Sequence, residues 1–167
     1  ITISGGVQLS GPVLLDPTGG SSPTPSGSPF QGSNFGYIMG GYVSPAPPSL
    51  ATNAIQKYSY ASDGNATDSG DLMQDTRWGG SGNSSSSSGY MAGARTGASS
   101  LSSKIEKFPF VSGGNTTSNA NLTNGGSNYV GYSSSTDGYT YGGETAPNGA
   151  VMLKTDKFSF ASDTDST

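Results

Sequence analysis

Residues 55–62 read IQKYSYAS, a lysine followed by two aromatic residues that lie two positions apart. The same pattern returns at 105–112 (IEKFPFVS) and at 155–162 (TDKFSFAS), so the three copies are spaced by 50 residues. Such self-similarity at a fixed period indicates one supersecondary unit copied in tandem. The sequence therefore predicts a repeat protein in which each unit buries its apolar face against the next unit.

A second marker follows a similar period. The pattern Gly-Tyr-x-x-Gly occurs at 36–40, 89–93 and 138–142. In each unit a variable loop follows this marker, and the strand with alternating aromatic residues comes next. These aromatic residues share one face, because side chains of a strand alternate with period two. We expect three matched positions to be equivalent and buried: Tyr58, Phe108 and Phe158. The lysines before them recur in register, which favours a structural role, either in pairing with an acidic group of a neighbouring unit or in protecting a strand edge.

The composition favours short strands that are joined by many turns. Of the 167 residues, 27 are glycine and 10 are proline, and only 11% are charged. Glycine and serine disfavour helix interiors, whereas disordered chains combine low hydrophobicity with high charge. The predicted class is therefore all-β, with no helix longer than about two turns.

Several functional classes are excluded or disfavoured by the same composition. The chain has no cysteine and no histidine, which excludes disulfides, thiol nucleophiles, histidine bases and Cys/His zinc sites. A net charge of −4 with seven scattered basic residues disfavours nucleic-acid binding. No apolar run is long enough to predict a membrane span. We expect no enzymatic activity, no cofactor and no metal ion.

Three segments are predicted along the chain. Residues 1–15 contain two short strands, residues 16–29 form a Pro/Gly/Ser linker, and residues 30–167 contain about three units. Several short strands per unit fit a four-stranded antiparallel blade. The predicted fold is thus β-propeller-like and incomplete within this chain, because a closed propeller needs roughly four to eight blades.

The order of these elements resembles the kelch-type blade. Three stretches resemble more closely the tandem repeats of tail-fibre and other virion structural proteins of aquatic bacteriophages, cyanophages especially: 65–72 (NATDSGDL), 105–110 (IEKFPF) and 137–143 (DGYTYGG). The resemblance covers residues 30–167, although residues 113–123 depart from the Asp/Gly turn of the pattern. It implies a structural appendage on the virion surface, outside the cell, that displays β repeats for host attachment.

Two other functions stay open at this point. An extracellular carbohydrate-binding or filament-forming microbial surface protein would use the same repeats without a virus. A glycan depolymerase would need two carboxylates across a cleft, for which Asp71 and Asp75 are the conceivable pair.

The predicted partners are further copies of this chain, other virion proteins and host-surface glycans. Open units expose strand edges that favour association, and the fibre resemblance implies a homotrimer. Residues 1–15 are expected to be an attachment segment, because a lone pair of short strands is unstable in water and would pair with another chain.

The candidate glycan contacts are aromatic residues near polar side chains. Trp78 is the only tryptophan, and position 128 of the next unit is asparagine. Arg77 precedes Trp78, and Tyr90 and Tyr139 are further candidates. Aromatic faces stack on sugar rings while nearby polar groups hydrogen-bond to hydroxyls.

Two polar patterns have simpler explanations than a site. The turn at 63–71 (DGNATDSGD) carries oxygen ligands of the kind that calcium prefers. The corresponding turn at 113–121 lacks carboxylates, so a polar turn is favoured over a metal site. Four Asn-x-Ser/Thr patterns are expected by chance in so polar a chain: Asn65, Asn83, Asn115 and Asn121.

Overall fold

The computed structural model describes residues 34–43, 50–96, 100–145 and 149–167. These residues form nine strands and no helix: β1 (Phe35–Val43), β2 (Leu50–Ser59), β3 (Thr67–Thr76), β4 (Ser81–Ser84), β5 (Ser88–Arg95), β6 (Leu101–Pro109), β7 (Thr117–Ser133), β8 (Asp137–Glu144) and β9 (Thr155–Ser159). The predicted all-β class is confirmed. The predicted segments 1–15 and 16–29 lie outside the described residues.

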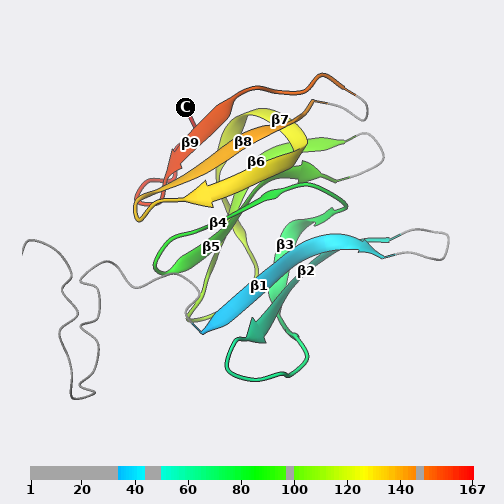
Figure 1. The fold of residues 1–167 in the computed structure, drawn as a ribbon, viewed down its shortest axis with the longest axis vertical. Helices are drawn as coiled ribbons and strands as arrows, with labels where there is room; N and C mark the ends of the chain where they lie inside the picture. The colour runs from blue at the N-terminus through cyan, green and yellow to red at the C-terminus, as the bar shows by residue number, and fades with distance from the viewer. Residues whose placement is uncertain (1–33, 44–49, 97–99, 146–148) are drawn as a thin grey trace, which may run out of the picture.

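Neighbouring strands pair antiparallel and in sequence order. β1, β2 and β3 form one sheet, and β4 to β9 form a second. The 17-residue β7 pairs with β6 up to Gly126 and with β8 from Ser127 onward. We therefore define unit 1 as β1–β3, unit 2 as β4–β6 with the first part of β7, and unit 3 as the second part of β7 with β8, β9 and the turn after it. Units 1 and 3 lie at opposite ends of the long axis (Figure 1).

Unit 2 contains the predicted four antiparallel strands, whereas units 1 and 3 contain three each among the described strands. Among the described strands, the three units do not close into a barrel or a ring.

Two conformational requirements explain the Gly-Tyr-x-x-Gly marker. Its first glycine lies under an aromatic ring of the paired strand: Gly36 under Tyr58, Gly89 under Phe108 and Gly138 under Phe158. A Cβ at any of these positions would overlap ring atoms. The second glycine has a positive φ in every unit, +64° at Gly40, +65° at Gly93 and +73° at Gly142. Residues with a side chain rarely adopt this conformation.

Aromatic side chains pack unit 1 against unit 2. The ring of Tyr37 contacts Phe108 edge-on and stacks on Phe110, with a centroid distance of 5.1 Å in both cases. Buried aliphatic residues complete this layer: Ile55, Leu72, Met91 and Ala94. The layer draws on both units, so each unit supplies one wall of a shared core.

The same arrangement recurs between units 2 and 3. The ring of Tyr90 lies 5.7 Å from that of Phe158 and stacks on Phe160 at 4.8 Å. The surrounding buried residues are Ala92, Ile105, Ala120 and Leu122. The burial predicted for Phe108 and Phe158 is confirmed.

Tyr58 has the equivalent position in unit 1 but is only half-buried, and Tyr60 beside it is 58% exposed. The prediction that Tyr58 is buried is therefore wrong. The physical reason is that burial at this position requires the marker tyrosine of a preceding unit. Tyr37 of unit 1 covers Phe108 of unit 2 in this way. No described strand lies on that side of unit 1.

Buried acidic side chains add polar contacts between units. Oε2 of Glu106 accepts hydrogen bonds from the backbone N–H of Met73 in unit 1 (2.8 Å) and from the hydroxyl of Thr116 (2.6 Å). The equivalent residue of unit 3, Asp156, accepts a hydrogen bond from the hydroxyl of Thr123 in unit 2 (2.8 Å). Charged acceptors make stronger hydrogen bonds than neutral ones, so these carboxylates hold adjacent units together.

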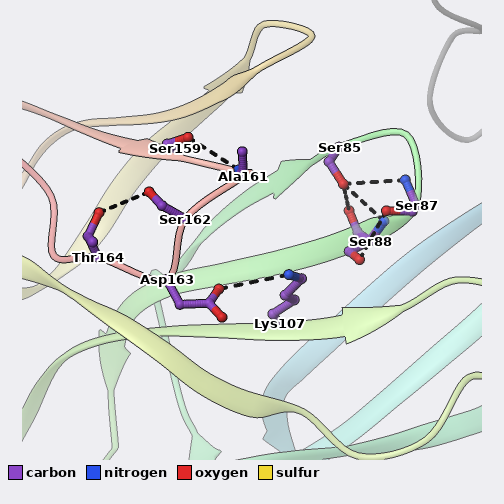
Figure 2. A network of polar contacts seen from close by, with 9 residues as sticks. All are labelled: Ser85, Ser87, Ser88, Lys107, Ser159, Ala161, Ser162, Asp163 and Thr164. Carbon is purple, nitrogen blue, oxygen red and sulfur yellow. Dashed lines mark hydrogen bonds and ion pairs between the residues drawn. The ribbon is translucent and has the colours of Figure 1, made fainter.

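The recurring lysines lie over the marker tyrosines. The Nζ-to-centroid distances are 6.0 Å for Lys57 and Tyr37, 5.8 Å for Lys107 and Tyr90, and 5.9 Å for Lys157 and Tyr139. Figure 2 shows that Lys107 also faces Asp163 in the turn after β9, at 3.9 Å. The expected pairing with an acidic group of a neighbouring unit is thus confirmed for Lys107.

Candidate functional site

The candidate site lies at the connection between units 1 and 2. β3 ends at Thr76 and β4 begins at Ser81, and between them Trp78 forms an isolated bridge with Arg95. The N–H of Arg77 donates to the carbonyl of Arg95 (2.7 Å), and the N–H of Arg95 donates to the carbonyl of Trp78 (2.9 Å). These backbone bonds fix the position of the tryptophan, whose side chain is 44% exposed.

Two arginines and a tyrosine surround the Trp78 ring. The guanidinium carbons of Arg95 and Arg77 lie 4.8 Å and 5.3 Å from the ring centre. The ring of Tyr42, at the end of β1, lies 5.5 Å away, and Arg77 is also 4.9 Å from this second ring. Cation–π contacts contribute roughly 0.5–1 kcal/mol each at exposed sites, so they orient these side chains. We call Tyr42, Arg77, Trp78 and Arg95 the Trp78 cluster.

A pocket of about 140 Å³ adjoins the cluster. It is lined by Met39, Thr76, Trp78 and Met91 and by residues 79–82, among others. The buried hydroxyl of Thr76 has no hydrogen-bond partner among the described residues, although buried polar groups normally have one. The pocket thus combines methionine side chains with polar groups, beside a partly exposed aromatic ring.

The equivalent connection between units 2 and 3 lacks these side chains. The residue equivalent to Trp78 is Ser127 and not Asn128, because Ser127 pairs with Glu144 in the same way as Trp78 pairs with Arg95. A small buried hydroxyl and a carboxylate therefore replace the indole and the guanidinium on the same backbone path. The fold does not require the Trp78 cluster, because it forms the same connection without it.

The structure brings two of the four predicted contact residues together. Arg77 and Trp78 belong to the cluster, and Tyr90 and Tyr139 lie elsewhere. Tyr90 is 3% exposed between units 2 and 3, where a surface ligand does not reach it. Tyr139 is on the outer side of unit 3, with its ring stacked on Tyr132 at 5.0 Å.

Tyr42 and Arg95 were not predicted from the sequence. Each lies six residues after the first glycine of its marker, Gly36 or Gly89, so the two positions are equivalent in the repeat. Aligning the markers would have revealed this equivalence. It would not have shown that Trp78 lies between the two side chains, because that contact depends on how unit 1 packs on unit 2.

The other predicted patterns serve local structure. Oδ1 of Asp68 accepts a hydrogen bond from the N–H of Gly70 (3.2 Å), as in a polar turn. Nδ2 of Asn83 donates to the carbonyls of Tyr132 (2.7 Å) and Tyr139 (3.0 Å), which ties unit 2 to unit 3. In the part of the chain that the structure describes, no three Asp, Glu, Cys or His side chains group in a way that could hold a metal ion.

Two comparisons of the sequence with known proteins find no match. No protein family matches the chain, and no curated protein matches its sequence. No helix that could cross a membrane occurs in the described residues. The function is therefore inferred from the repeat array and from the Trp78 cluster.

Proposed function

We propose that this chain is a structural and adhesive repeat protein of an extracellular appendage, with a phage tail fibre or fibre-like virion protein as the leading case. One observation carries the proposal: equivalent units hold one partly exposed side-chain cluster that does not recur on the equivalent backbone. A repeat array provides an extended surface for display. A specialised cluster on such a surface is the place at which we expect host glycans to bind.

The chemistry of the cluster favours glycans with acidic groups. Trp78 and Tyr42 are 44% and 38% exposed, and partly exposed aromatic rings contact the apolar faces of sugar rings. The guanidinium carbons of Arg95 and Arg77 bring two positive charges to 4.8 Å and 5.3 Å from the centre of the indole ring, and positive charge attracts carboxylates and sulfates. The adjoining pocket can take a ring substituent.

Tryptophan fluorescence tests this proposal directly, because Trp78 is the only tryptophan in the chain. We expect a uronic-acid homopolymer to change the emission in a saturable manner, and a neutral glucan of the same length to bind at least about tenfold more weakly. Added salt should weaken the binding of the uronic-acid polymer, because screening reduces the attraction to the arginines.

Matched variants locate the binding. The Arg95→Gln variant should lose the preference for the acidic polymer. The Trp78→Ala variant should lose most of the affinity, measured by calorimetry because this variant has no tryptophan emission. Phe35→Ala is the control, because Phe35 is an exposed aromatic residue at the opposite end of β1 from Tyr42. Equal binding by the Trp78→Ala variant and the wild-type chain would reject the site.

Two further tests separate the alternative functions. Capsid, portal or tail genes beside this gene would support the virion assignment over a carbohydrate-binding or filament-forming microbial surface protein. New reducing ends after incubation with a bound polysaccharide would instead indicate a depolymerase.

A further inference from the structure

The two ends of the array carry exposed apolar faces. The outer face of unit 1 contains Ile38, Tyr58 and Tyr60, and the outer face of unit 3 contains Val130, Tyr132, Tyr139 and Tyr141. Ile38 is 55% exposed and Val130 is 62% exposed. These faces lie on opposite ends of the molecule, so they do not cover each other within one chain (Figure 1).

The outer face of unit 1 has the geometry of an inner face. Inside the array, Phe108 and Phe110 meet edge-on with a centroid distance of 5.6 Å and an interplanar angle of 80°. Tyr58 and Tyr60 have nearly the same arrangement, at 5.5 Å and 88°. Phe108 and Phe110 cover the marker tyrosine of the preceding unit. Tyr58 and Tyr60 are therefore already arranged to cover such a ring.

The outer face of unit 3 offers that ring. Tyr139 is the marker tyrosine of unit 3, equivalent to Tyr37 and Tyr90, which the next units cover. Tyr132 of the same unit stacks on Tyr139 at 5.0 Å, but no described residue of another unit packs on Tyr139 in the way that Phe110 of unit 2 packs on Tyr37. A second copy of unit 1 would supply the missing aromatic pair.

The polar pair that joins units 2 and 3 is replaced by aliphatic residues at the equivalent positions of the two outer faces. Between units 2 and 3, the hydroxyls of Ser81 and Thr140 are hydrogen-bonded at 2.8 Å. The register of β7 with β8 places Val130 where Ser81 lies in unit 2. Likewise Ile38 follows Gly36 by two residues, as Thr140 follows Gly138. Val130 and Ile38, the residues at the two equivalent outer positions, are thus both aliphatic. A contact between them would leave no buried hydroxyl without a hydrogen-bond partner.

We propose that the outer face of unit 1 packs on the outer face of unit 3 of a second copy of this chain. Tyr58 and Tyr60 of one copy cover Tyr139 of the other, and Ile38 meets Val130. The contact is head-to-tail, and such contacts generate rings when the rotation closes and filaments when it does not. This inference does not depend on the proposed glycan site, which lies at the connection between units 1 and 2.

Complementary blocked variants test the proposal. Ile38→Asp blocks the outer face of unit 1, and Val130→Asp blocks that of unit 3. We expect the wild-type chain to form assemblies larger than a monomer, measured by light scattering coupled to gel filtration. Each variant alone should associate at least about 100-fold more weakly, because every contact would bury an unpaired carboxylate. An equimolar mixture of the two should form a one-to-one dimer, since one wild-type contact is then available.

Control measurements keep the result interpretable. Val111→Asp places the same charge on a fully exposed apolar residue after β6 and should assemble like the wild-type chain. Circular dichroism establishes that each variant is folded. A wild-type chain that stays monomeric, or blocked variants that assemble alone, would overturn the proposal. Two blocked variants that do not combine would overturn it as well.

Discussion

The inner and outer faces of the units carry equivalent aromatic residues that differ in burial. Phe108 is 1% exposed on an inner face, whereas Tyr58 is half-buried on the outer face of unit 1. On the opposite side of the units, the marker tyrosine Tyr90 is 3% exposed under unit 3, whereas the equivalent Tyr139 on the outer face of unit 3 is half-buried. The comparison teaches that a neighbouring unit, and not the sequence of the strand, decides burial at these positions.

The largest effect should come from truncating the inner aromatic position. Phe108→Ala should lower the free energy of unfolding by about 3–5 kcal/mol, because it leaves a cavity between two units. Tyr58→Ala, at the equivalent outer position, should cost about 1 kcal/mol, as an average substitution does. Urea denaturation of dilute samples measures both values. Equal losses would contradict the comparison.

The buried carboxylate should show the same contrast at a smaller scale. Glu106→Ala should cost about 1.5–3 kcal/mol, because it leaves the N–H of Met73 and the hydroxyl of Thr116 without their charged acceptor. Gln56, the exposed equivalent in unit 1, should tolerate alanine within about 0.5 kcal/mol. Thermal denaturation followed by circular dichroism measures the difference, and a sensitive Gln56 would argue against the contrast.

The two connections between units permit a third comparison. Gly79 and Asn128 occupy equivalent places and have φ values of +71° and +60°. Asn128→Ala should cost about 1–2 kcal/mol, because alanine is strained in the left-handed region. Asn128→Gly is the matched control and should keep wild-type stability. If both variants melt at the same temperature, backbone strain does not limit this connection.

The smallest effect at neutral pH concerns Tyr129, which follows Asn128. Burial, together with the nearby charge of Asp156, raises the pKa of the Tyr129 hydroxyl to about 12. The folded state therefore keeps this proton at a pH where the unfolded chain, with a tyrosine pKa of about 10, has released it. The stabilisation is fully present below about pH 10 and is lost as the pH rises towards 12.

Tyr129→Phe isolates this contribution. The difference in melting temperature between the variant and the wild-type chain should change in favour of the variant between about pH 10 and pH 12. At neutral pH the variant loses only the hydrogen bond that the Tyr129 hydroxyl donates to the carbonyl of Asn124. A difference that stays constant over the alkaline range would show that this hydroxyl does not titrate with a raised pKa.

Periodic features of the chain could be predicted from the sequence. The alternating aromatic residues indicated strands, and the period located Phe108 and Phe158 in the core. The burial of Tyr58 could not be predicted, because it depends on the number of units that pack in a row. The uninterrupted path of β7 through two units was also missed, since its glycines and asparagines are typical of turns.

The candidate site was only half predictable. Trp78 stood out because it breaks the repeat, and Arg77 was found because it is adjacent. Arg95 lies on a different unit, and its contact with Trp78 is set by an isolated bridge. Tyr90 was a candidate as an aromatic residue in a polar sequence, but stacking of the units places it in the core.

The long strand β7 has a mechanical consequence. Units 2 and 3 share it, so a force that pulls along the chain must rupture its ladders with β6 and β8 before these units come apart. Unit 1 is tethered to unit 2 through residues 77–80, which contain two glycines and one isolated bridge. Under tension we expect unit 1 to detach first and units 2 and 3 to extend later, together. A surface appendage built this way would yield in steps under load, and the first step would pull apart the Trp78 cluster.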